Sequence, residues 1–178
     1  FRSLTITQAP TIASTSGNTQ IQLGSDVTLS CNATGVPQPT IYWYKSTAAG
    51  ETEDLGVQDC RYQIRNATTS DAGKYECIAD NGTPPTAKAQ IIVEALFAPS
   101  ITLPHDSHNQ ELGKDTLIEC IVESNPQGTI YWEKDGQRLE DGEKYQIFEW
   151  EVGSYKHNLA ARVKSLTSED FGEYKCYA

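Results

Sequence analysis

Two stretches decide the fold of this chain: DAGKYEC at residues 71–77 and DFGEYKC at residues 170–176. Both read Asp-x-Gly-x-Tyr-x-Cys, a pattern specific enough that chance repetition is a poor explanation. A chain that carries such a pattern twice contains an internal repeat, so the residues upstream of each copy should correspond as well.

The upstream residues do correspond. Cys31 lies in DVTLSCNA, and Trp43 follows twelve positions later in TIYWYK. Cys120 lies in DTLIECIV, and Trp132 follows twelve positions later in TIYWEK. Each half of the chain therefore reads Cys, Trp and Asp-x-Gly-x-Tyr-x-Cys, which predicts two copies of one domain side by side.

Length and composition agree with two small soluble domains. The chain has 178 residues, and 38% of them are hydrophobic, which is enough for packed cores. A boundary at Leu96 gives domains of residues 1–96 and 97–178, with formal charges of −3 and −7. No basic run occurs in either half, which argues against nucleic acid and anionic membranes as partners. No stretch approaches about 18 consecutive apolar residues, so we expect no membrane insertion by this segment.

Apolar residues near the repeated marks alternate with period two, as in strands that have one buried face. Val27, Leu29 and Cys31, for example, share one face of a predicted strand. KDGQ at residues 134–137 places Asp-Gly between two strand-like segments, which predicts a tight hairpin. Many short strands separated by Pro, Gly, Asn and Ser clusters, without an amphipathic helix, predict an all-β fold of two β-sandwiches.

The order of these marks resembles tandem immunoglobulin domains of the I-set or C2-like kind, and the resemblance covers essentially the whole chain. CNATGVPQPTIYWYK at residues 31–45 is also similar to a middle domain of the IgLON and lachesin-like families, which include the Dpr-interacting neuronal adhesion proteins. DFGEYKCYA at residues 170–178 suits the domain after it. The resemblance implies two disulfides: Cys31 with Cys77, and Cys120 with Cys176.

The physics of a sandwich explains why the motif is repeated. Its sheets pack about 10 Å apart, so a disulfide needs inward-pointing cysteines on facing strands. The motif glycine tolerates a tight corner, and the tyrosine hydroxyl returns to the backbone there. The motif aspartate can pair with a base, and we expect Lys144 to pair with Asp170. Only two residues follow Cys176, so we expect the second sandwich to lack its final strand within these 178 residues; either the chain is a fragment or its end lies beyond them.

Three Asn-x-Ser/Thr sequons occur, at Asn32, Asn66 and Asn81, all in the first domain. Such sequons are acceptors for N-linked glycans in secreted proteins. Together with two disulfide-forming cysteine pairs, they favour an extracellular protein, secreted or at the cell surface.

The fifth cysteine, Cys60, has no partner within this scheme. It shares the parity of Tyr62 and Ile64, so we expect it to face the core at the edge of a strand. Two fates are open for it: a buried free thiol or an interchain disulfide.

The sequence offers little chemistry. His105 and His108 have metal-like proximity, with Asp106 between them, but no third ligand lies nearby, so we expect a solvated loop and no metal or other cofactor. No G-x-S-x-G, Walker or H-E-x-x-H motif occurs. We therefore expect no enzymatic activity.

Surfaces for protein contacts are better candidates. Tyr42 and Tyr44 flank inward Trp43, and Ile78 follows inward Cys77, so the three should point outward from one sheet. In the second domain, Phe148 and Trp150 should point outward if their alternate neighbours point inward. Ordinary strand propensity explains the tyrosines, and packing at a hairpin end explains Trp150, equally well.

The resemblance implies a cell-adhesion or recognition protein that makes homophilic or heterophilic contacts with another immunoglobulin protein or with itself. The alternative is a secreted or receptor protein that binds a soluble ligand, such as a growth factor or an immune target. An intracellular array of the kind found in muscle scaffolds is a third reading, which reduced cysteines and unused sequons would favour.

Overall fold

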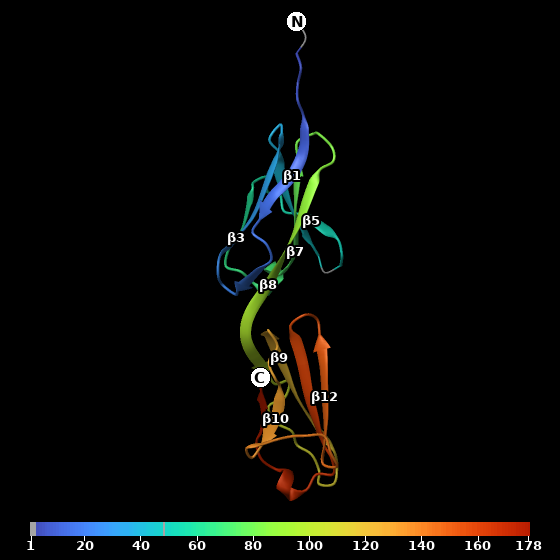
Figure 1. Cartoon of the computed structure of the whole chain (residues 1–178). Coiled ribbons are helices and arrows are strands. Elements are labelled where there is room, and N and C mark those ends of the chain that lie inside the picture. The colour runs from blue at the N-terminus through green and yellow to red at the C-terminus, as the bar shows by residue number, and fades with distance from the viewer. Residues whose placement is uncertain (1–2, 48) are drawn as a thin grey trace. The chain divides into compact units, whose positions relative to one another are not determined.

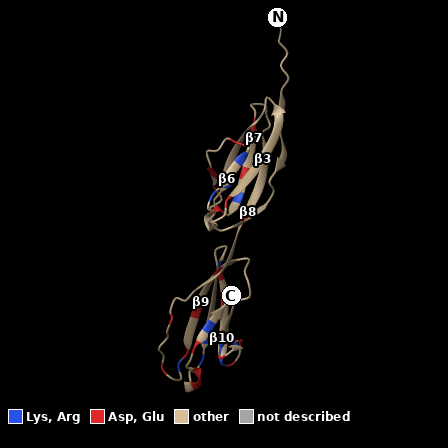
Figure 2. Ribbon diagram, turned by 90° about the vertical axis from the view of Figure 1, so that its left-hand side faces the viewer, with Lys and Arg blue, Asp and Glu red and all other residues tan. Residues whose placement is uncertain are grey.

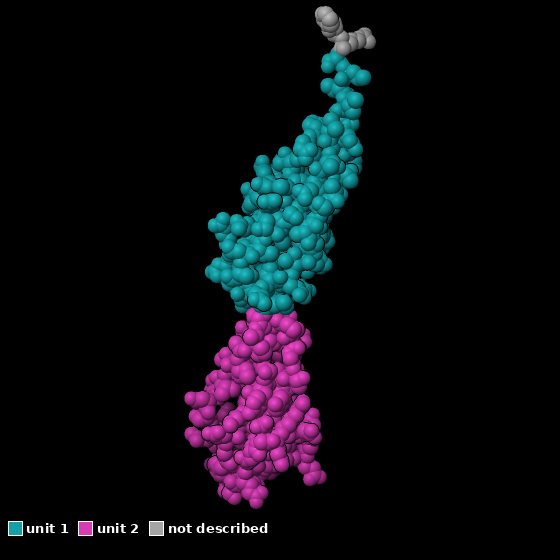
Figure 3. Space-filling view, turned by 60° about the vertical axis from the view of Figure 1, so that its left-hand side comes forward, with its two compact units in different colours: residues 1–96 teal, residues 97–178 magenta. Residues whose placement is uncertain are grey.

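The computed structural model describes residues 3–47 and 49–178 (Figure 1). They form two compact units, residues Phe1–Leu96 and Phe97–Ala178, coloured separately in Figure 3. Apart from two single-turn 3-10 helices, η1 (Thr69–Asp71) and η2 (Ser168–Asp170), all regular structure in the described residues is strand. The prediction of an all-β fold is confirmed.

Unit 1 is a sandwich of two sheets. One contains β1, β3 and β6, and the other has the order β5-β4-β7-β8, with β2 pairing parallel to β8. The strands are β1 (Gln8–Thr15), β2 (Thr19–Gln22), β3 (Val27–Val36), β4 (Thr40–Ser46), β5 (Thr52–Asp54), β6 (Arg61–Ile64), β7 (Gly73–Asp80) and β8 (Ala87–Thr102).

The core of unit 1 lies where the period-two pattern predicts it. Leu29 and Cys31 on β3 face Trp43 on β4 and Cys77 on β7, and none of the four has exposed surface. The Cys31–Cys77 disulfide joins the two sheets across a Cα–Cα distance of 6.5 Å. The Trp43 indole N–H donates to the carbonyl of Asp59 at 2.8 Å, so the large ring is buried without an unsatisfied donor.

Unit 2 repeats this plan with different strands. One sheet has the order β12-β13-β9 followed by the end of β8, and the other has the order β11-β10-β14. The strands are β9 (Thr116–Asn125), β10 (Tyr131–Lys134), β11 (Gln137–Arg138), β12 (Tyr145–Val152), β13 (Lys156–Val163) and β14 (Tyr174–Tyr177). The tight hairpin is confirmed: Asp135 and Gly136 join β10 to β11 with φ of 52° and 77°.

The core of unit 2 is built around a second disulfide. Cys120 and Cys176 are bonded with a Cα–Cα distance of 6.5 Å. Beside them, the Trp132 indole N–H donates to the carbonyl of Leu159 at 3.3 Å. Other residues of this core are Ile118, Val122, Ile130, Leu139 and Ala161. Both disulfides that the resemblance implies are present.

The repeated motif forms the same corner in both units. The Tyr75 hydroxyl donates to the Asp71 carbonyl at 2.7 Å, and the Tyr174 hydroxyl donates to the Asp170 carbonyl at 2.9 Å. Burial raises the pKa of both tyrosines well above the ordinary value, so both hydroxyls keep their proton. The motif glycine of unit 1, Gly73, has φ of +140°, which a residue with a Cβ rarely adopts.

The expected ion pair in unit 2 is confirmed. The Lys144 ammonium donates to the Asp170 carboxylate, which also accepts from the Thr167 N–H at 2.7 Å. Burial by itself would raise the pKa of Asp170, but the hydrogen bonds from Lys144 and Thr167 outweigh it and hold this pKa below its ordinary value.

The two units differ at one sheet edge. β7 pairs with β4 on one side and with β8 on the other. Its counterpart β14 pairs with β10, and no other strand of residues 3–47 and 49–178 pairs with it. As expected, the second sandwich lacks its final strand within these 178 residues.

Candidate protein-binding surface

The outer face of the four-stranded sheet in unit 1 carries the aromatic residues that the sequence singles out. Trp43 and Cys77 point into the core, so their neighbours Tyr42, Tyr44 and Ile78 point outward, where each is half-buried. We call seven of the outward side chains of β4, β7 and β8 the tyrosine face: Tyr42, Tyr44, Glu76, Ile78, Lys88, Gln90 and Ile92. The exposed Lys74, which pairs with Ile92, borders it.

The strand register brings the apolar members of this face together. Tyr42 lies opposite Ile78, and Ile78 lies opposite Lys88. Cross-strand pairs of this kind have Cβ atoms about 4.5–5.5 Å apart, so Tyr42 and Ile78 are direct neighbours. Tyr44 lies opposite Glu76 and diagonal to Ile78, and we call Tyr42, Tyr44 and Ile78 the apolar strip.

The surroundings of the strip are polar. Lys88 and Glu76 approach to 3.7 Å between Nζ and Oε1, and this exposed pair adds little stability. Sequence reasoning missed Ile92, which is 46% exposed at the edge of the face. The sequence could have revealed it, because Ile92 lies between the inward residues Ile91 and Val93, and alternation in a strand then directs Ile92 outward. An apolar strip with a charged rim can bind another protein surface.

Unit 2 carries a smaller aromatic site on β12. Tyr145 and Ile147 pack against the core, so Phe148 and Trp150 point outward; Phe148 is half-buried and Trp150 is 42% exposed. The Arg162 guanidinium lies 5.7 Å from the Phe148 ring, a cation–π contact that the sequence did not reveal. The structure thus places the five candidate interface residues in two groups, one in each unit.

Along the ribbon in Figure 2, Lys and Arg positions are interspersed with Asp and Glu positions. In the described part of the chain, no helix has the length and apolar content that crossing a membrane requires.

The three sequon asparagines have different environments. Asn32 and Asn66 are exposed, and the Asn32 amide donates one hydrogen bond, to Ser14 Oγ at 3.1 Å. Asn81 is half-buried, and its Nδ2 donates to the carbonyls of Gln8 and Pro37, both at 2.8 Å. Both amide hydrogens of Asn81 therefore have protein acceptors.

The expected inward position of Cys60 is wrong. Cys60 is a free thiol, and it is exposed. The alternation of Tyr62 and Ile64 belongs to β6, which begins at Arg61, and it does not extend into the bend at residues 59–60. The Asp59 carboxylate accepts from the Arg61 N–H at 3.0 Å and shapes this bend. A hydrogen bond from Cys60 lowers the pKa of Asp59, which agrees with an outward thiol.

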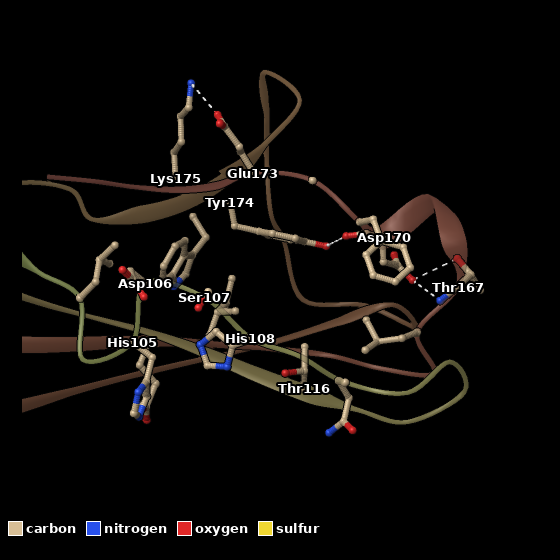
Figure 4. A pocket seen from close by; sticks show the side chains of 18 residues that line it. His105, Asp106, Ser107, His108, Thr116, Thr167, Asp170, Glu173, Tyr174 and Lys175 are labelled. Atoms are coloured by element: carbon tan, nitrogen blue, oxygen red, sulfur yellow. Dashed lines mark hydrogen bonds and ion pairs between the residues drawn. The ribbon is translucent and has the colours of Figure 1, made fainter.

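His105 and His108 line a groove of about 410 Å³ in unit 2 (Figure 4). Their rings meet edge to face with centroids 5.7 Å apart. Among residues 3–47 and 49–178, no three His, Cys, Asp or Glu side chains come together as a metal site would need. The lining is mixed: Trp132, Leu166 and Tyr174 contribute apolar surface, and Asp106, Glu173 and Lys175 are among its charged residues.

Comparison with known proteins agrees with this geometry. The model of the immunoglobulin domain family matches residues 9–81 and 98–178. The chain is similar to Lachesin of Drosophila melanogaster, with 31% identity over 98% of the chain, and to Protein amalgam of the same organism, with 32% identity over 99%. It spans 49% and 54% of these relatives, about half their length.

A solved structure is similar as well. One chain in the crystal structure of Dpr2 Ig1-Ig2 in complex with DIP-Theta Ig1-Ig3 matches with a TM-score of 0.82 and 30% identity, covering 96% of this chain and 60% of that one. The resemblance to lachesin-like immunoglobulin proteins is therefore confirmed. On the family match and on the two disulfide-bridged sandwiches, this chain belongs to the immunoglobulin domain family.

Proposed function

We propose that this chain is an extracellular recognition segment of a cell-adhesion protein, and that it binds another immunoglobulin-domain protein through the tyrosine face of unit 1. The observation that carries the proposal is the strip formed by Tyr42, Tyr44 and Ile78 on an exposed sheet. Tyrosine supplies large contact area and a hydroxyl, and it is enriched among the residues that dominate binding energy.

The relatives support this class of partner. The similar solved structure is a complex between two immunoglobulin proteins, and it favours a heterophilic contact over a homophilic one. A stable contact buries about 800 Å² on each partner. The seven side chains of the tyrosine face would be the centre of such a patch, with strand-end residues as its rim.

Extracellular placement rests on the covalent chemistry. Disulfides such as Cys31–Cys77 and Cys120–Cys176 persist in oxidising compartments. The exposed sequons at Asn32 and Asn66 support the same placement. We assign the chain no catalytic role, because the described geometry offers a binding surface and the similar solved structure is a complex between Dpr2 and DIP-Theta.

The test is a binding screen with matched variants. The chain would be presented on a sensor surface to a panel of immunoglobulin ectodomains, to itself, and to soluble growth factors and immune ligands. We expect binding to an immunoglobulin ectodomain, weakened about 10–100-fold by Tyr44→Ala. The control Thr28→Ala, on the other sheet of unit 1, should leave affinity unchanged.

Two outcomes would contradict the proposal. Binding only to a soluble ligand would support the alternative function. Binding that persists in Tyr42→Ala and Tyr44→Ala but is lost in Trp150→Ala would place the contact on unit 2.

A further inference from the structure

One row of side chains across the tyrosine face has a carboxylate on each side of an aromatic ring. In the strand register, Tyr44 of β4 lies opposite Asp54 of β5 and opposite Glu76 of β7. Residues directly opposite each other in antiparallel strands project from the same face of the sheet, with Cβ atoms about 4.5–5.5 Å apart. We call Asp54, Tyr44 and Glu76 the acidic row.

The chain itself neutralises the two carboxylates to different degrees. Asp54 is exposed, and its Oδ1 accepts from the Gly56 N–H at 2.8 Å, but no ion pair of the described residues includes it. The Glu76 Oε1 lies 3.7 Å from the ammonium of Lys88, and the exposed Lys74 is two residues away on the same strand. The β5 side of the acidic row therefore keeps more of its negative charge.

The ring of Tyr44 has no cation of its own. In the described part of the chain, no lysine or arginine lies over this ring, and no other ring packs against it. Tyr44 is half-buried, so part of its surface faces solvent. The face of a tyrosine ring attracts a cation, and carboxylates on both sides attract the same charge. The acidic row therefore brings two attractions for a cation to one point of the tyrosine face.

The equivalent position in unit 2 carries the opposite charge. TIYWYK at residues 40–45 corresponds to TIYWEK at residues 129–134, so Tyr44 corresponds to Glu133. Arg138 of β11 lies opposite Glu133, as Asp54 of β5 lies opposite Tyr44. At the strand that ends this sheet, unit 2 has an arginine where unit 1 has an aspartate.

The arginine of unit 2 lies against a tyrosine. The Arg138 guanidinium is 5.1 Å from the centroid of the Tyr131 ring, and Tyr131 corresponds to Tyr42 of the tyrosine face. This sheet therefore holds a guanidinium against a tyrosine where the chain supplies one. Unit 1 supplies a carboxylate instead, so a cation for its tyrosines has to come from another molecule.

The two cationic side chains of proteins do not fit the acidic row equally well. A guanidinium is planar and weakly hydrated, so it stacks on an aromatic ring while its N–H groups donate to carboxylates in its own plane. A lysine ammonium is a compact, strongly hydrated charge and gains less from the ring. Arginine is also enriched among the residues that dominate binding energy at protein interfaces.

We propose that the partner of the tyrosine face contributes an arginine, whose guanidinium stacks on Tyr44 and pairs with the carboxylates of Asp54 and Glu76. The inference rests on the proposed function for the partner's existence and adds the chemical group that the partner presents. Asp54 contributes more than Glu76, because Lys88 already lies beside Glu76. One exposed arginine binds weakly, and the surrounding partner surface strengthens the contact by excluding water.

The variants remove charge and keep shape. Asp54→Asn retains the Oδ1 that accepts from Gly56, and Glu76→Gln retains the length of its side chain. Asp80→Asn is the matched control, because Asp80 is an exposed carboxylate of β7 whose Oδ1 accepts from the Gly82 N–H, also at 2.8 Å. Circular dichroism checks that each variant is folded.

The first test needs no partner. Acetyl-arginine amide, an arginine with both ends blocked, is titrated into the chain at millimolar concentrations while NMR follows the backbone amide signals. We expect the signals of residues 44, 54 and 76 to shift most, and acetyl-lysine amide to shift them about half as much or less. Asp54→Asn should remove most of the shift, whereas Asp80→Asn should leave it unchanged. Asp54→Arg, which copies unit 2, should abolish it.

The second test uses an immunoglobulin ectodomain that binds in the screen described above. We expect Asp54→Asn to weaken its affinity about tenfold, Glu76→Gln to weaken it less, and Asp80→Asn to leave it unchanged. Raising the salt concentration should weaken binding to wild type more than binding to Asp54→Asn, because screening acts on the charge that the variant lacks.

The proposal is overturned if the arginine probe shifts residues 44, 54 and 76 no more than other exposed carboxylates, or if the lysine probe acts equally. An ectodomain that loses affinity with Tyr44→Ala but not with Asp54→Asn and Glu76→Gln together would also overturn it, and would leave the proposed function intact. If the probe binds the acidic row but no immunoglobulin ectodomain binds the tyrosine face, the proposed function fails and the guanidinium site stands.

Discussion

The same two motif residues are buried to different degrees in the two units. Tyr75 and Cys77 of β7 are 1% and 0% exposed, whereas Tyr174 and Cys176 of β14 are only partly buried. Both tyrosines make the same corner hydrogen bond, and both cysteines make the same disulfide. The difference comes from the neighbouring strand: β8 covers one side of β7, and no described strand covers that side of β14.

This comparison separates what the repeated residues determine from what their neighbours determine. The repeat fixes the disulfide, the buried tryptophan and the corner, and these parts of each unit are alike. The sheet edges depend on residues outside the repeat, and there the units differ. In a polypeptide of these 178 residues, unit 2 should be the less stable of the two, because Tyr174 and Cys176 of its core are partly exposed.

Removing the disulfides is the strongest way to expose this difference. The bridges close loops with sequence separations of 46 and 56 residues, so each stabilises its unit by about 4 kcal/mol. Because the free energy of unfolding is expected to be smaller for unit 2, losing the same amount of it should unfold unit 2 but not unit 1. We expect unit 2 to unfold at 25 °C when Cys120 and Cys176 are replaced by Ala, and unit 1 to stay folded when Cys31 and Cys77 are replaced.

Limited proteolysis with mass spectrometry identifies which unit is cleaved in each variant. In the wild type, graded reduction followed by alkylation should label Cys120 and Cys176 before Cys31 and Cys77. If both variants unfold together, or if unit 1 is cleaved first, the open edge of β14 has no consequence for stability.

The disulfides, the buried tryptophans and the tyrosine corners could be predicted, because each depends on residues at a fixed, short spacing in the sequence. Trp43 and Trp132 follow their cysteines at one spacing, and a sandwich core with a bridging disulfide needs that arrangement. Tyr75 and Tyr174 are similarly tied to an aspartate four residues earlier. The outward positions of Tyr42 and Phe148 followed from alternation with inward neighbours.

Other features depend on contacts that alternation does not encode. Cys60 was misplaced because the bend at Asp59 interrupts the pattern before β6 begins. The polar partners of Asn81 lie on segments distant in sequence, at Gln8 and Pro37. The groove beside Tyr174 is lined by segments far apart in the sequence, residues 103–110 and 166–175, and no single motif reports that.

A second difference between the units is the lysine that supports the motif aspartate. Asp170 pairs with Lys144, whereas Asp71 accepts from the Thr68 N–H and hydroxyl, both at 2.8 Å, with no ion pair in the described structure. We expect Lys144→Met to destabilise unit 2 by about 1.5–3 kcal/mol, because a nearly buried carboxylate loses a charged donor. Lys114→Met, at an exposed position of unit 2, is the control.

The effect of pH on this pair has a definite sign. The folded-state pKa of Asp170 is lowered, so its ionised form stabilises unit 2 at pH values above the unfolded pKa of about 3.9. That contribution is lost as pH falls through the lower, folded-state pKa. Thermal unfolding followed from pH 7 to pH 2 should show this loss in wild type and a smaller loss in Lys144→Met. Identical pH profiles would contradict the assignment.

A third difference between the units is glycosylation, since all three sequons belong to unit 1. A glycan replaces one hydrogen of the asparagine amide, and both hydrogens of Asn81 are already donated to carbonyls. We expect glycans at Asn32 and Asn66 and none at Asn81 in native material. Asn81→Asp should cost unit 1 about 1–2 kcal/mol, because it removes two hydrogen bonds.

Peptide mapping by mass spectrometry reads out the three sites, and thermal unfolding of Asn66→Asp provides the matched control at an exposed sequon. A glycan found at Asn81 in folded protein would show that its amide does not hold the Gln8 and Pro37 carbonyls. An equal loss of stability in both variants would show that the hydrogen bonds of Asn81 contribute nothing specific.

The smallest expected effect concerns Cys60, a residue with no cysteine counterpart in unit 2. Because its thiol is exposed and makes no disulfide, Cys60→Ser should change the stability of unit 1 by less than about 0.5 kcal/mol. The native chain should nevertheless present one thiol to a disulfide reagent without denaturant, and mild oxidation should give a dimer on non-reducing electrophoresis that Cys60→Ser abolishes. A thiol that reacts only after unfolding would show that Cys60 is buried. The alternating pattern of β6 would then extend back to residue 60, and the bend at Asp59 would not interrupt it.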